Sequence, residues 1–427
     1  MIEEKRILKN KQISETKKTT IDRHKSMDVK TFCVKIQENR LTKEQRYALE
    51  TVFLEQKWYK NYILNWLEAN SENKLKEFNT KLTNITKKDK NLNDIDIKIK
   101  FLSAQSRQCL VSRMIANLKT MKTLRNKGLQ KYGKLRFSKE EFAIDLKQYG
   151  VSHRILTNKR IKIAGLPKTF IVNGVKQFKD IQGIEIANAR LLHKGGGYYV
   201  QFVCYIPKTE LKSKIDGIIG IDFGCSTTLT LSNGDKFSVK IPESERLKKC
   251  QKNQARKQKG SKNWHREVEK VRKAHQKILN KKNDLANKIV AKICQFETVV
   301  IQDEQLSNWH KNSHSKAIQY SILGRVKSKL KQKPNVRILN KFLPTTKLCT
   351  NCGKYHDKIT QYDRVFKCDC GVNEDRDIHA AKNMIWFYKN VGVERANFKR
   401  AEMKALVASI ISANNQLLSE KHEADTF

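Results

Sequence analysis

The sequence predicts a multi-domain α/β protein. Its 427 residues exceed the roughly 100–200 residues of a typical domain. Strand-like and helical segments alternate in its second half, and four of its ten cysteines lie close together there. With 39% hydrophobic residues and only 5 prolines, the chain can form real cores and has no low-complexity character. We expect no membrane span, because no stretch approaches about 18 uninterrupted apolar residues.

The charge of the chain predicts a polyanionic partner. It has 87 Lys and Arg against 43 Asp and Glu, which gives a net charge of +44. Nucleic acid fits, because each phosphate that is neutralised releases counterions and adds affinity. The excess is clustered: residues 103–139 carry ten basic residues and no acid, and residues 241–290 carry sixteen against five acids. A basic protein without a nucleic-acid partner is the alternative.

The first 125 residues predict mainly helical structure. Residues 1–27 are polar and aperiodic, which indicates a disordered basic tail. A strand is expected at 30–37, and Thr42 begins a capping box for a helix of about 25 residues. Residues 70–95 indicate a loop or a frayed helix, and a second helix is expected at about 97–125.

Strand patterns dominate from about residue 140 to residue 210. Asn173-Gly174 is a strong hairpin signal, and Gly195-Gly196-Gly197 indicates another hairpin turn because no helix follows it. Alternating β and α segments come next. In order, they are three strands within 217–240, a helical pair at 243–295, a strand at 298–303, a helix at about 313–330, a strand at 336–340 and a helix at about 376–390.

The four clustered cysteines predict a structural zinc site. They form two knuckles, Cys349-Thr-Asn-Cys352-Gly and Cys368-Asp-Cys370-Gly. Two such knuckles around a short hairpin place four thiolates tetrahedrally around one Zn²⁺ and leave no open position for catalysis. The second knuckle reads CxC, where a usual ribbon has CxxC. The remaining cysteines are scattered and the first residues contain no secretory signal, so we expect reduced thiols in a cytoplasm.

Three acids mark a candidate metal-dependent centre. Asp222 lies in IGIDFG, Glu304 ends TVVIQDE, and Asp377 begins the helix of EDRDIHAAKNM. One acid at such a position is usually a cap or a surface residue. Three of them on β-α-β elements of so basic a chain favour a site for two Mg²⁺ about 4 Å apart that cleaves phosphodiesters. The glycines flanking Asp222 would let the scissile phosphate approach the backbone.

The order GIDFG, VVIQDE, CTNCG, CDCG, DRDIHAAKNM resembles the split RuvC nuclease and inserted zinc ribbon of the TnpB family. TnpB proteins are RNA-guided nucleases of insertion sequences, and the miniature type V-F CRISPR effectors share the arrangement. The basic run over 245–278 resembles the helical insertion that follows the first RuvC motif. The specific match covers residues 217–390, and the first half of the chain resembles the family only in layout.

The resemblance implies roles for individual residues. Asp222, Glu304 and Asp377 would be catalytic and would hold two Mg²⁺ per RuvC site, although Asp303 beside Glu304 leaves that register open. Arg364 matches a basic residue that precedes the third ribbon cysteine. Zinc would be structural, with the ligands Cys349, Cys352, Cys368 and Cys370.

The resemblance also implies an RNase H-like RuvC nuclease domain with an inserted zinc ribbon, preceded by a β-rich wedge domain that a helical recognition lobe interrupts. The expected boundaries are 1–27 for a disordered basic tail, 28–40 and 126–215 for the wedge domain, 41–125 for the recognition lobe, 216–345 and 372–415 for the RuvC-like domain, 346–371 for the zinc ribbon and 416–427 for a loose tail.

The function that the resemblance implies is RNA-guided DNA cleavage in a prokaryotic cytoplasm, at the nucleoid when DNA is bound. Guide RNA and target DNA would be the partners, and a homodimer on one guide is left open. A nuclease-inactive RNA-guided DNA-binding repressor is the first alternative. A generic basic RNA-binding protein is the second, but it does not explain the order of acids and cysteines. The sequence does not separate a transposon TnpB from a CRISPR effector.

Overall fold

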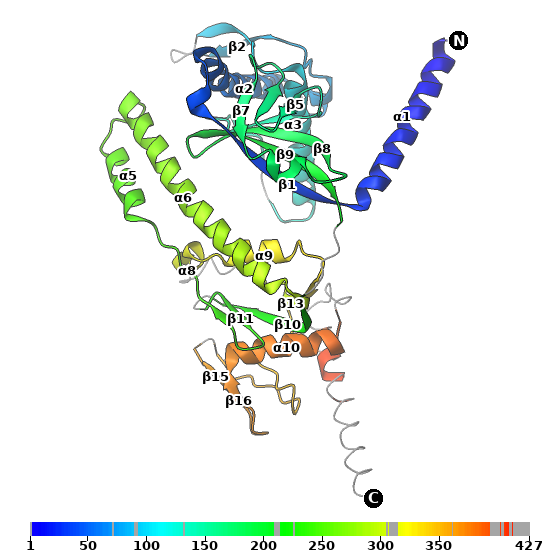
Figure 1. The fold of residues 1–427 in the computed structure, drawn as a ribbon, viewed down its shortest axis with the longest axis vertical. Coiled ribbons are helices and arrows are strands. Elements are labelled where there is room, and N and C mark those ends of the chain that lie inside the picture. The colour runs from blue at the N-terminus through cyan, green and yellow to red at the C-terminus, as the bar shows by residue number, and fades with distance from the viewer. Residues whose placement is uncertain are drawn as a thin grey trace, which may run out of the picture. The chain divides into compact units, whose positions relative to one another are not determined.

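The computed structural model places two compact units, Met1–Thr209 and Glu210–Phe427, and each is described by itself (Figure 1). The residues that the structure describes are 2–70, 72–88, 93–130, 133–208, 214–224, 227–304, 306, 315–360, 362–392, 402, 405–409 and 412. The expected loose tail at 416–427 lies outside them. In the described part of the chain, no helix is long and apolar enough to cross a membrane.

A seven-stranded antiparallel sheet forms the centre of the first unit. Strand β1 pairs along most of its length with β9, from Met27↔Pro207 to Lys35↔Tyr199. The strand before the two long helices of this unit therefore lies in the same sheet as the strands after them. The order across the sheet is β4 (Ala143–Leu146), β8 (Glu185–Lys194), β9 (Gly197–Pro207), β1 (Met27–Ile36), β7 (Phe170–Asn173), β6 (Arg160–Ile163) and β5 (His153–Thr157).

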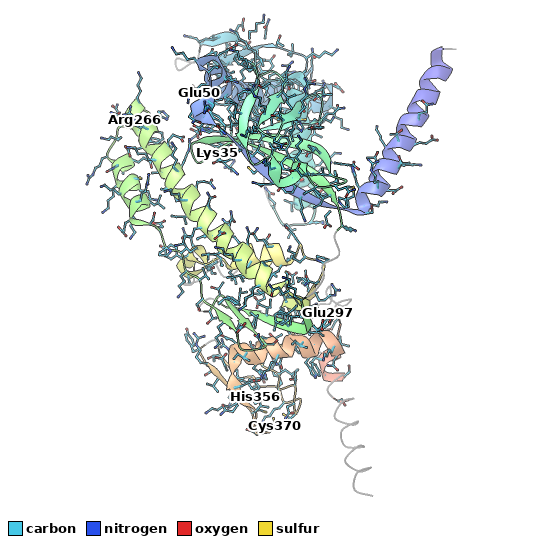
Figure 2. All side chains as sticks on the ribbon, in the orientation of Figure 1. Lys35, Glu50, Arg266, Glu297, His356 and Cys370 are labelled. Carbon is cyan, nitrogen blue, oxygen red and sulfur yellow. The ribbon has the colours of Figure 1, made fainter. Side chains whose placement is uncertain are left out.

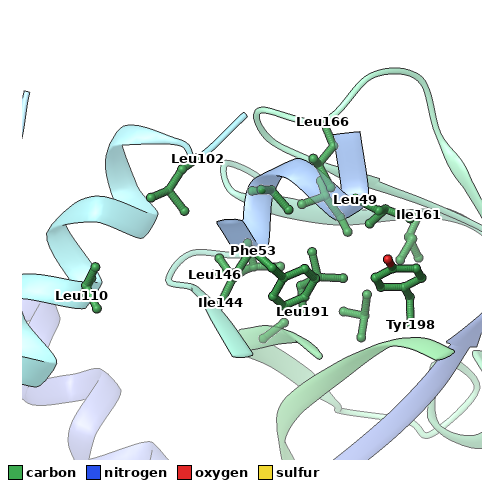
Figure 3. Close-up of a cluster of buried hydrophobic side chains, with 14 of the residues drawn as sticks. Leu49, Phe53, Leu102, Leu110, Ile144, Leu146, Ile161, Leu166, Leu191 and Tyr198 are labelled. Carbon is green, nitrogen blue, oxygen red and sulfur yellow. The ribbon is translucent and has the colours of Figure 1, made fainter. Parts of the chain in front are cut away.

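Two long helices share the hydrophobic core of this sheet. Helix α2 (Lys43–Ala69) begins at the expected capping box, in which Thr42 and Gln45 satisfy each other's backbone N–H groups. Its Phe53 packs against Tyr198 of β9 with ring centroids 6.1 Å apart (Figure 3). Helix α3 (Ala104–Asn126) follows, and the buried Glu55 of α2 accepts three backbone N–H groups just before it. The short elements are η1 (Glu38–Arg40), η2 (Glu72–Glu77) and α4 (Lys176–Lys179).

Three expectations for the first unit are wrong. Residues 2–25 form helix α1 (Ile2–Lys25) and not the expected disordered tail. Glu, Lys and Arg favour a helix even without an apolar stripe. The last turn is fixed to the sheet because His24 stacks on Tyr205. The segment 70–95 contains η2 and a hairpin of β2 (Asn84–Lys88) and β3 (Asp94–Lys98). Gly174, at φ +109°, turns the chain into α4 and not into a hairpin, because Val175 is already helical.

The second unit contains a mixed five-stranded sheet. Strand β10 lies at its centre, antiparallel to β11 and parallel to β13, and β13 is parallel to β14. The order is β12 (Lys236–Phe237), β11 (Leu229–Leu231), β10 (Ile215–Phe223), β13 (Phe296–Gln302) and β14 (Val336–Leu339). The carboxyl ends of the parallel strands β10 and β13 therefore lie at one edge of the sheet.

Helices cover both faces of this sheet. Helix α6 (Lys262–Ile293) packs its last turns onto the core, follows α5 (Glu245–Ala255), and begins at the side-chain cap Ser261. The expected helix at 313–330 is two helices, α8 (Ser315–Tyr320) and α9 (Leu323–Leu330), separated at Ser321-Ile322. Helix α10 (Arg376–Asn390) packs Met384 and Phe387 in a separate core cluster with Val300 and Leu339 of the sheet. A small hairpin of β15 (Val365–Lys367) and β16 (Asn373–Asp375) leads directly into α10.

Candidate functional site

Asp222 lies near the carboxyl end of the central strand β10. Its neighbours Ile221 and Phe223 are buried in the core, so the alternation of a strand turns Asp222 toward the opposite face. Glu304 comes two residues after β13. Because β13 is parallel to β10, Asp222 and Glu304 are delivered to the same edge of the sheet.

Asp377 enters this site from helix α10. It lies in the first helical turn, and the Asp375 side chain caps that turn by accepting the backbone N–H groups of Asp377 and Ile378 at 3.0 and 3.1 Å. Gly220 of β10 fixes the approach of the helix: a Cβ there would lie 1.9 Å from the Ala381 carbonyl oxygen. We expected the glycines beside Asp222 to admit a phosphate, but Gly220 admits the backbone of α10.

The three carboxylates form one electrostatic cluster. Burial raises the pKa of Asp222 well above its usual range, and the charges of Glu304 and Asp377 raise it further, while Arg376 opposes them. Burial also raises the pKa of Glu304 to about 7, against the effect of Lys327. The structure therefore brings Glu304 and Asp377, which are far away in the sequence, within electrostatic range of Asp222.

The structure distinguishes Asp303 from Glu304. Asp303 is exposed and its carboxylate accepts a hydrogen bond from Lys331 at 2.5 Å. Glu304 is partly buried, and its Oε2 atom has no hydrogen-bond partner among the described residues. A buried carboxylate oxygen without a donor is costly unless a cation binds it. The geometry therefore favours Glu304 as the acid of this cluster.

Two cations beside the acids were not anticipated from the sequence. The side chain of Lys327 is buried in α9, 2.7 Å from the main-chain oxygen of Glu304 and 5.2 Å from the centre of the Phe223 ring. Its only sequence signal is that a lysine shares the apolar face of α9 with Leu323 and Leu330. Arg376 lies 3.1 Å from Asp377 Oδ1 and donates to the Thr360 carbonyl at 2.7 Å.

The four cysteines of the ribbon converge. Their sulfur atoms all lie within 4.8 Å of one another, and two pairs, Cys349–Cys370 and Cys352–Cys368, are 3.5 Å apart. Thiolates bound to one zinc at about 2.3 Å are separated by roughly 3.8 Å, so the cluster can hold Zn²⁺. The CxC knuckle closes because Gly371 follows it at φ +94°. Backbone N–H donation from Val372, with Asn351, lowers the pKa of the Cys370 thiol to about 6.

Comparisons with known proteins agree with the motif order. Residues 201–310 match the OrfB_IS605 family, described as a probable transposase, and residues 320–384 match the Cas12f1-like TNB domain. A Streptomyces pristinaespiralis protein named "Putative RNA-guided DNA endonuclease" is 30% identical over 202 residues, which are 45% of this chain and 50% of that protein. The match therefore spans about half the length of this curated relative.

A solved chain from the "Cryo-EM structure of the Cas12f1-sgRNA-target DNA complex" aligns with 84% of this chain and 99% of its own length. Its sequence identity is 14% and its TM-score is 0.41. The two family models and the curated relative confirm the resemblance to the TnpB and type V-F nucleases that the motifs indicate.

Proposed function

We propose that this chain is an RNA-guided DNA endonuclease with a RuvC-type centre formed by Asp222, Glu304 and Asp377. The observation that supports the proposal most is the approach of Glu304, from the segment after β13, and of Asp377, from α10, to Asp222 near the carboxyl end of β10. The curated relative is named for the same activity. The three antiparallel strands followed by two parallel ones also support an RNase H-like nuclease domain.

The cluster suits divalent metal ions. The charges of Glu304 and Asp377 both oppose ionisation of Asp222, which is unfavourable without a compensating cation, and Mg²⁺ prefers carboxylate oxygens. Glu304 Oε2, which has no hydrogen-bond partner within the described ranges, is the atom best placed to accept a metal ion. Two bound Mg²⁺ ions would supply an activated water and stabilise the leaving oxygen of a phosphodiester.

The protein's own groups would organise this chemistry. Asp222 is the central ligand, since both other acids act on it. Lys327 fixes the main chain of Glu304 and so the direction of its carboxylate. Arg376 holds Asp377 on the ribbon side of the centre. These contacts preorganise the acids before substrate arrives, which is the main way a protein contributes to phosphoryl chemistry.

The guide RNA and target DNA would bind basic surfaces by their backbones, while base pairing reads the sequence. Lys119, Lys122 and Arg125 of α3 are exposed, as is Arg266 of α6 (Figure 2). Arg107 belongs to the same basic run but is buried and donates to the carbonyls of Thr80 and Leu102, so its role is structural. We assign the first unit to the wedge domain and recognition lobe, and place the protein in a prokaryotic cytoplasm.

RNA that copurifies with the chain tests the guided activity. The protein is expressed with its native flanking DNA, and the bound RNA is sequenced. We expect one defined RNA with a variable segment, and Mg²⁺-dependent cleavage of DNA that matches this segment. Binding of the matched DNA without cleavage would instead indicate a guided repressor. Bulk cellular RNA without a defined species would refute guidance.

A further inference from the structure

The zinc ribbon is joined to the helix that carries Asp377. We count the whole β15–β16 hairpin with the ribbon, which extends it past the expected boundary at residue 371. Strand β16 ends at Asp375, and α10 begins at the next residue. At this junction the backbone N–H of Arg376 donates to the Arg364 carbonyl at 2.9 Å. The Arg376 guanidinium spans the ribbon carbonyl of Thr360 and the Asp377 carboxylate. The first turn of α10 therefore has its position set by the ribbon.

Two buried polar residues of α10 add a second link. The ring of His379 and the amide of Asn383 both donate to the Leu348 carbonyl, at 2.8 and 2.7 Å. Leu348 directly precedes the ligand Cys349. Asn383 also donates to the Thr345 carbonyl at 2.7 Å, and Thr350 Oγ1 donates to Asn383 Oδ1 at 2.9 Å. Both side chains are at most 3% exposed, so these bonds are shielded from water.

A ring stack between the β15–β16 hairpin and α10 is a third link. Phe366 of β15 lies parallel to the His379 ring, with centroids 3.6 Å apart and planes at 13°. The other ring nitrogen of His379 is 2.9 Å from Glu374 of β16. The ribbon thus contacts α10 through both its first knuckle and its hairpin.

We propose that the ribbon is a positioning element for the Asp377 carboxylate, and that zinc occupancy of the ribbon controls whether the nuclease centre binds its metal ions. Arg376, His379 and Asn383 are the positioning residues. The inference rests on the proposed function, because it assumes that Asp377 is a metal ligand. Zinc bound to the four cysteines would hold the knuckle that presents the Leu348 carbonyl. A loosened knuckle would release the first two turns of α10, and Asp377 with them.

Mn²⁺ binding tests this proposal, since Mn²⁺ shares the preference of Mg²⁺ for carboxylates and its unbound form is visible by electron paramagnetic resonance. Full-length protein free of nucleic acid is titrated as wild type, as Asn383→Leu and as Asn390→Leu. Asn390 is the matched control, because it is an exposed asparagine at the far end of the same helix. We expect Asn383→Leu to bind Mn²⁺ at least about tenfold more weakly while it keeps one zinc per chain, and Asn390→Leu to match wild type.

A purely structural role predicts something different. Asn383→Leu would then lower the unfolding midpoint, but the folded variant would bind Mn²⁺ within twofold of wild type, and that result would overturn the proposal. If Asn383→Leu does not fold, zinc-free wild type replaces it in the test. A chelator removes the zinc, and the protein is then exchanged into buffer without chelator. Its Mn²⁺ affinity should fall about tenfold or more while its circular dichroism stays largely intact. An unchanged affinity would refute the proposal.

Asp222→Ala separates this inference from the proposed function. If wild type binds no Mn²⁺, or if Asp222→Ala binds as well as wild type, the carboxylate centre itself is wrong and the inference falls with it. If binding requires Asp222 but does not respond to Asn383 or to zinc, only the ribbon proposal is wrong.

Discussion

The buried ammonium group of Lys327 lies 2.7 Å from the main-chain oxygen of Glu304. This bond connects α9 to the second residue after β13. Lys327 is 4% exposed, and it contacts Glu304 through the backbone, which leaves the carboxylate available for a metal. The lysine therefore orients the acid without neutralising it by a direct ion pair.

Replacement of Lys327 by methionine should slow cleavage by about 10–100-fold, because a displacement of about 1 Å at a reacting group costs this much. Methionine keeps the apolar stem and removes the hydrogen bond to Glu304. Single-turnover cleavage of guide-matched DNA at saturating protein measures the effect. The control is Lys331→Met, which removes the partner of the exposed Asp303 and should leave the rate nearly unchanged. Equal rates for both variants would show that Lys327 has no positioning role.

Metal affinity should increase with pH around neutrality. The pKa of Glu304 is about 7, so this group is largely protonated below that pH and must lose its proton to bind a cation. Calorimetric titration with Mg²⁺ at pH 6, 7 and 8 should therefore show tightening affinity as the pH rises. Asp303→Asn is the control and should keep this pH dependence. Glu304→Gln should weaken it, and the part that remains belongs to Asp222, whose pKa is also raised. Affinity that does not change with pH would contradict the assignment.

The raised pKa of Glu304 has the opposite consequence for the metal-free protein: its free energy of unfolding should decrease as the pH rises. The pKa of this carboxyl is higher in the folded protein than in the unfolded chain. Its contribution to stability is therefore fully present at low pH, where it is protonated in both states. Its contribution to stability is lost as the pH rises from the ordinary value of 4.5 toward about 7. Saturating Mg²⁺ should reverse this loss, which chemical denaturation with and without the ion would show.

Gly220 should not tolerate a side chain. Because a Cβ at this position would lie 1.9 Å from the Ala381 carbonyl, Gly220→Ala must push α10 away from β10. We expect a loss of about 2–4 kcal/mol in the free energy of unfolding, together with weaker metal binding. Gly324→Ala is the control, since among the described residues its new methyl group would meet Leu306 alone, at 3.9 Å. Equal unfolding free energies for the two variants would refute the close packing of α10.

His153 should make the first unit sensitive to acid. Burial lowers the pKa of this histidine to about 4, and its side chain packs beside Tyr149 and Phe202. The unfolded chain takes up a proton near pH 6.5, so the stability that the neutral ring contributes is lost as the pH falls from 6.5 toward 4. Relative to His153→Phe, wild type should lose up to about 3 kcal/mol over this range. Parallel pH profiles for the two proteins would contradict the prediction.

The sequence predicts the parts of the site that local patterns encode. Asp222 stands out because it interrupts an apolar strand, and the cysteine knuckles stand out by their spacing. Lys327 does not, because a lysine in a short amphipathic helix is usually solvated. Only the packing of α9 beside the end of β13 makes it part of the site. The role of Gly220 does not follow from the sequence for a similar reason: the group that it admits is the carbonyl of Ala381, 161 residues later in the chain.

In the fold, too, the sequence predicts the elements that local patterns encode and misses those that distant contacts set. The capping box at Thr42 predicts the start of α2, because both of its bonds are local. Helix α1 has no apolar stripe to indicate it, and the β2–β3 hairpin buries Ile85 in a segment that reads as polar. The asparagine–glycine pair at 173 and 174 forms a turn, but the next strand along the chain, β8, pairs with β4 and β9 and not with β7. Contacts that are distant in the sequence therefore decide the hairpin and the path of the chain after Gly174, whereas local bonds decide the start of α2.

A comparison of guided DNA cleavage by wild type and by Asp222→Ala tests the central claim most directly. Wild type and variant are loaded with the copurified RNA, mixed with matched DNA in Mg²⁺, and assayed in parallel for binding and strand cleavage. The account predicts that both proteins bind the DNA with similar affinity and that only wild type cuts it. Cleavage by Asp222→Ala at the wild-type rate would contradict the proposed carboxylate centre.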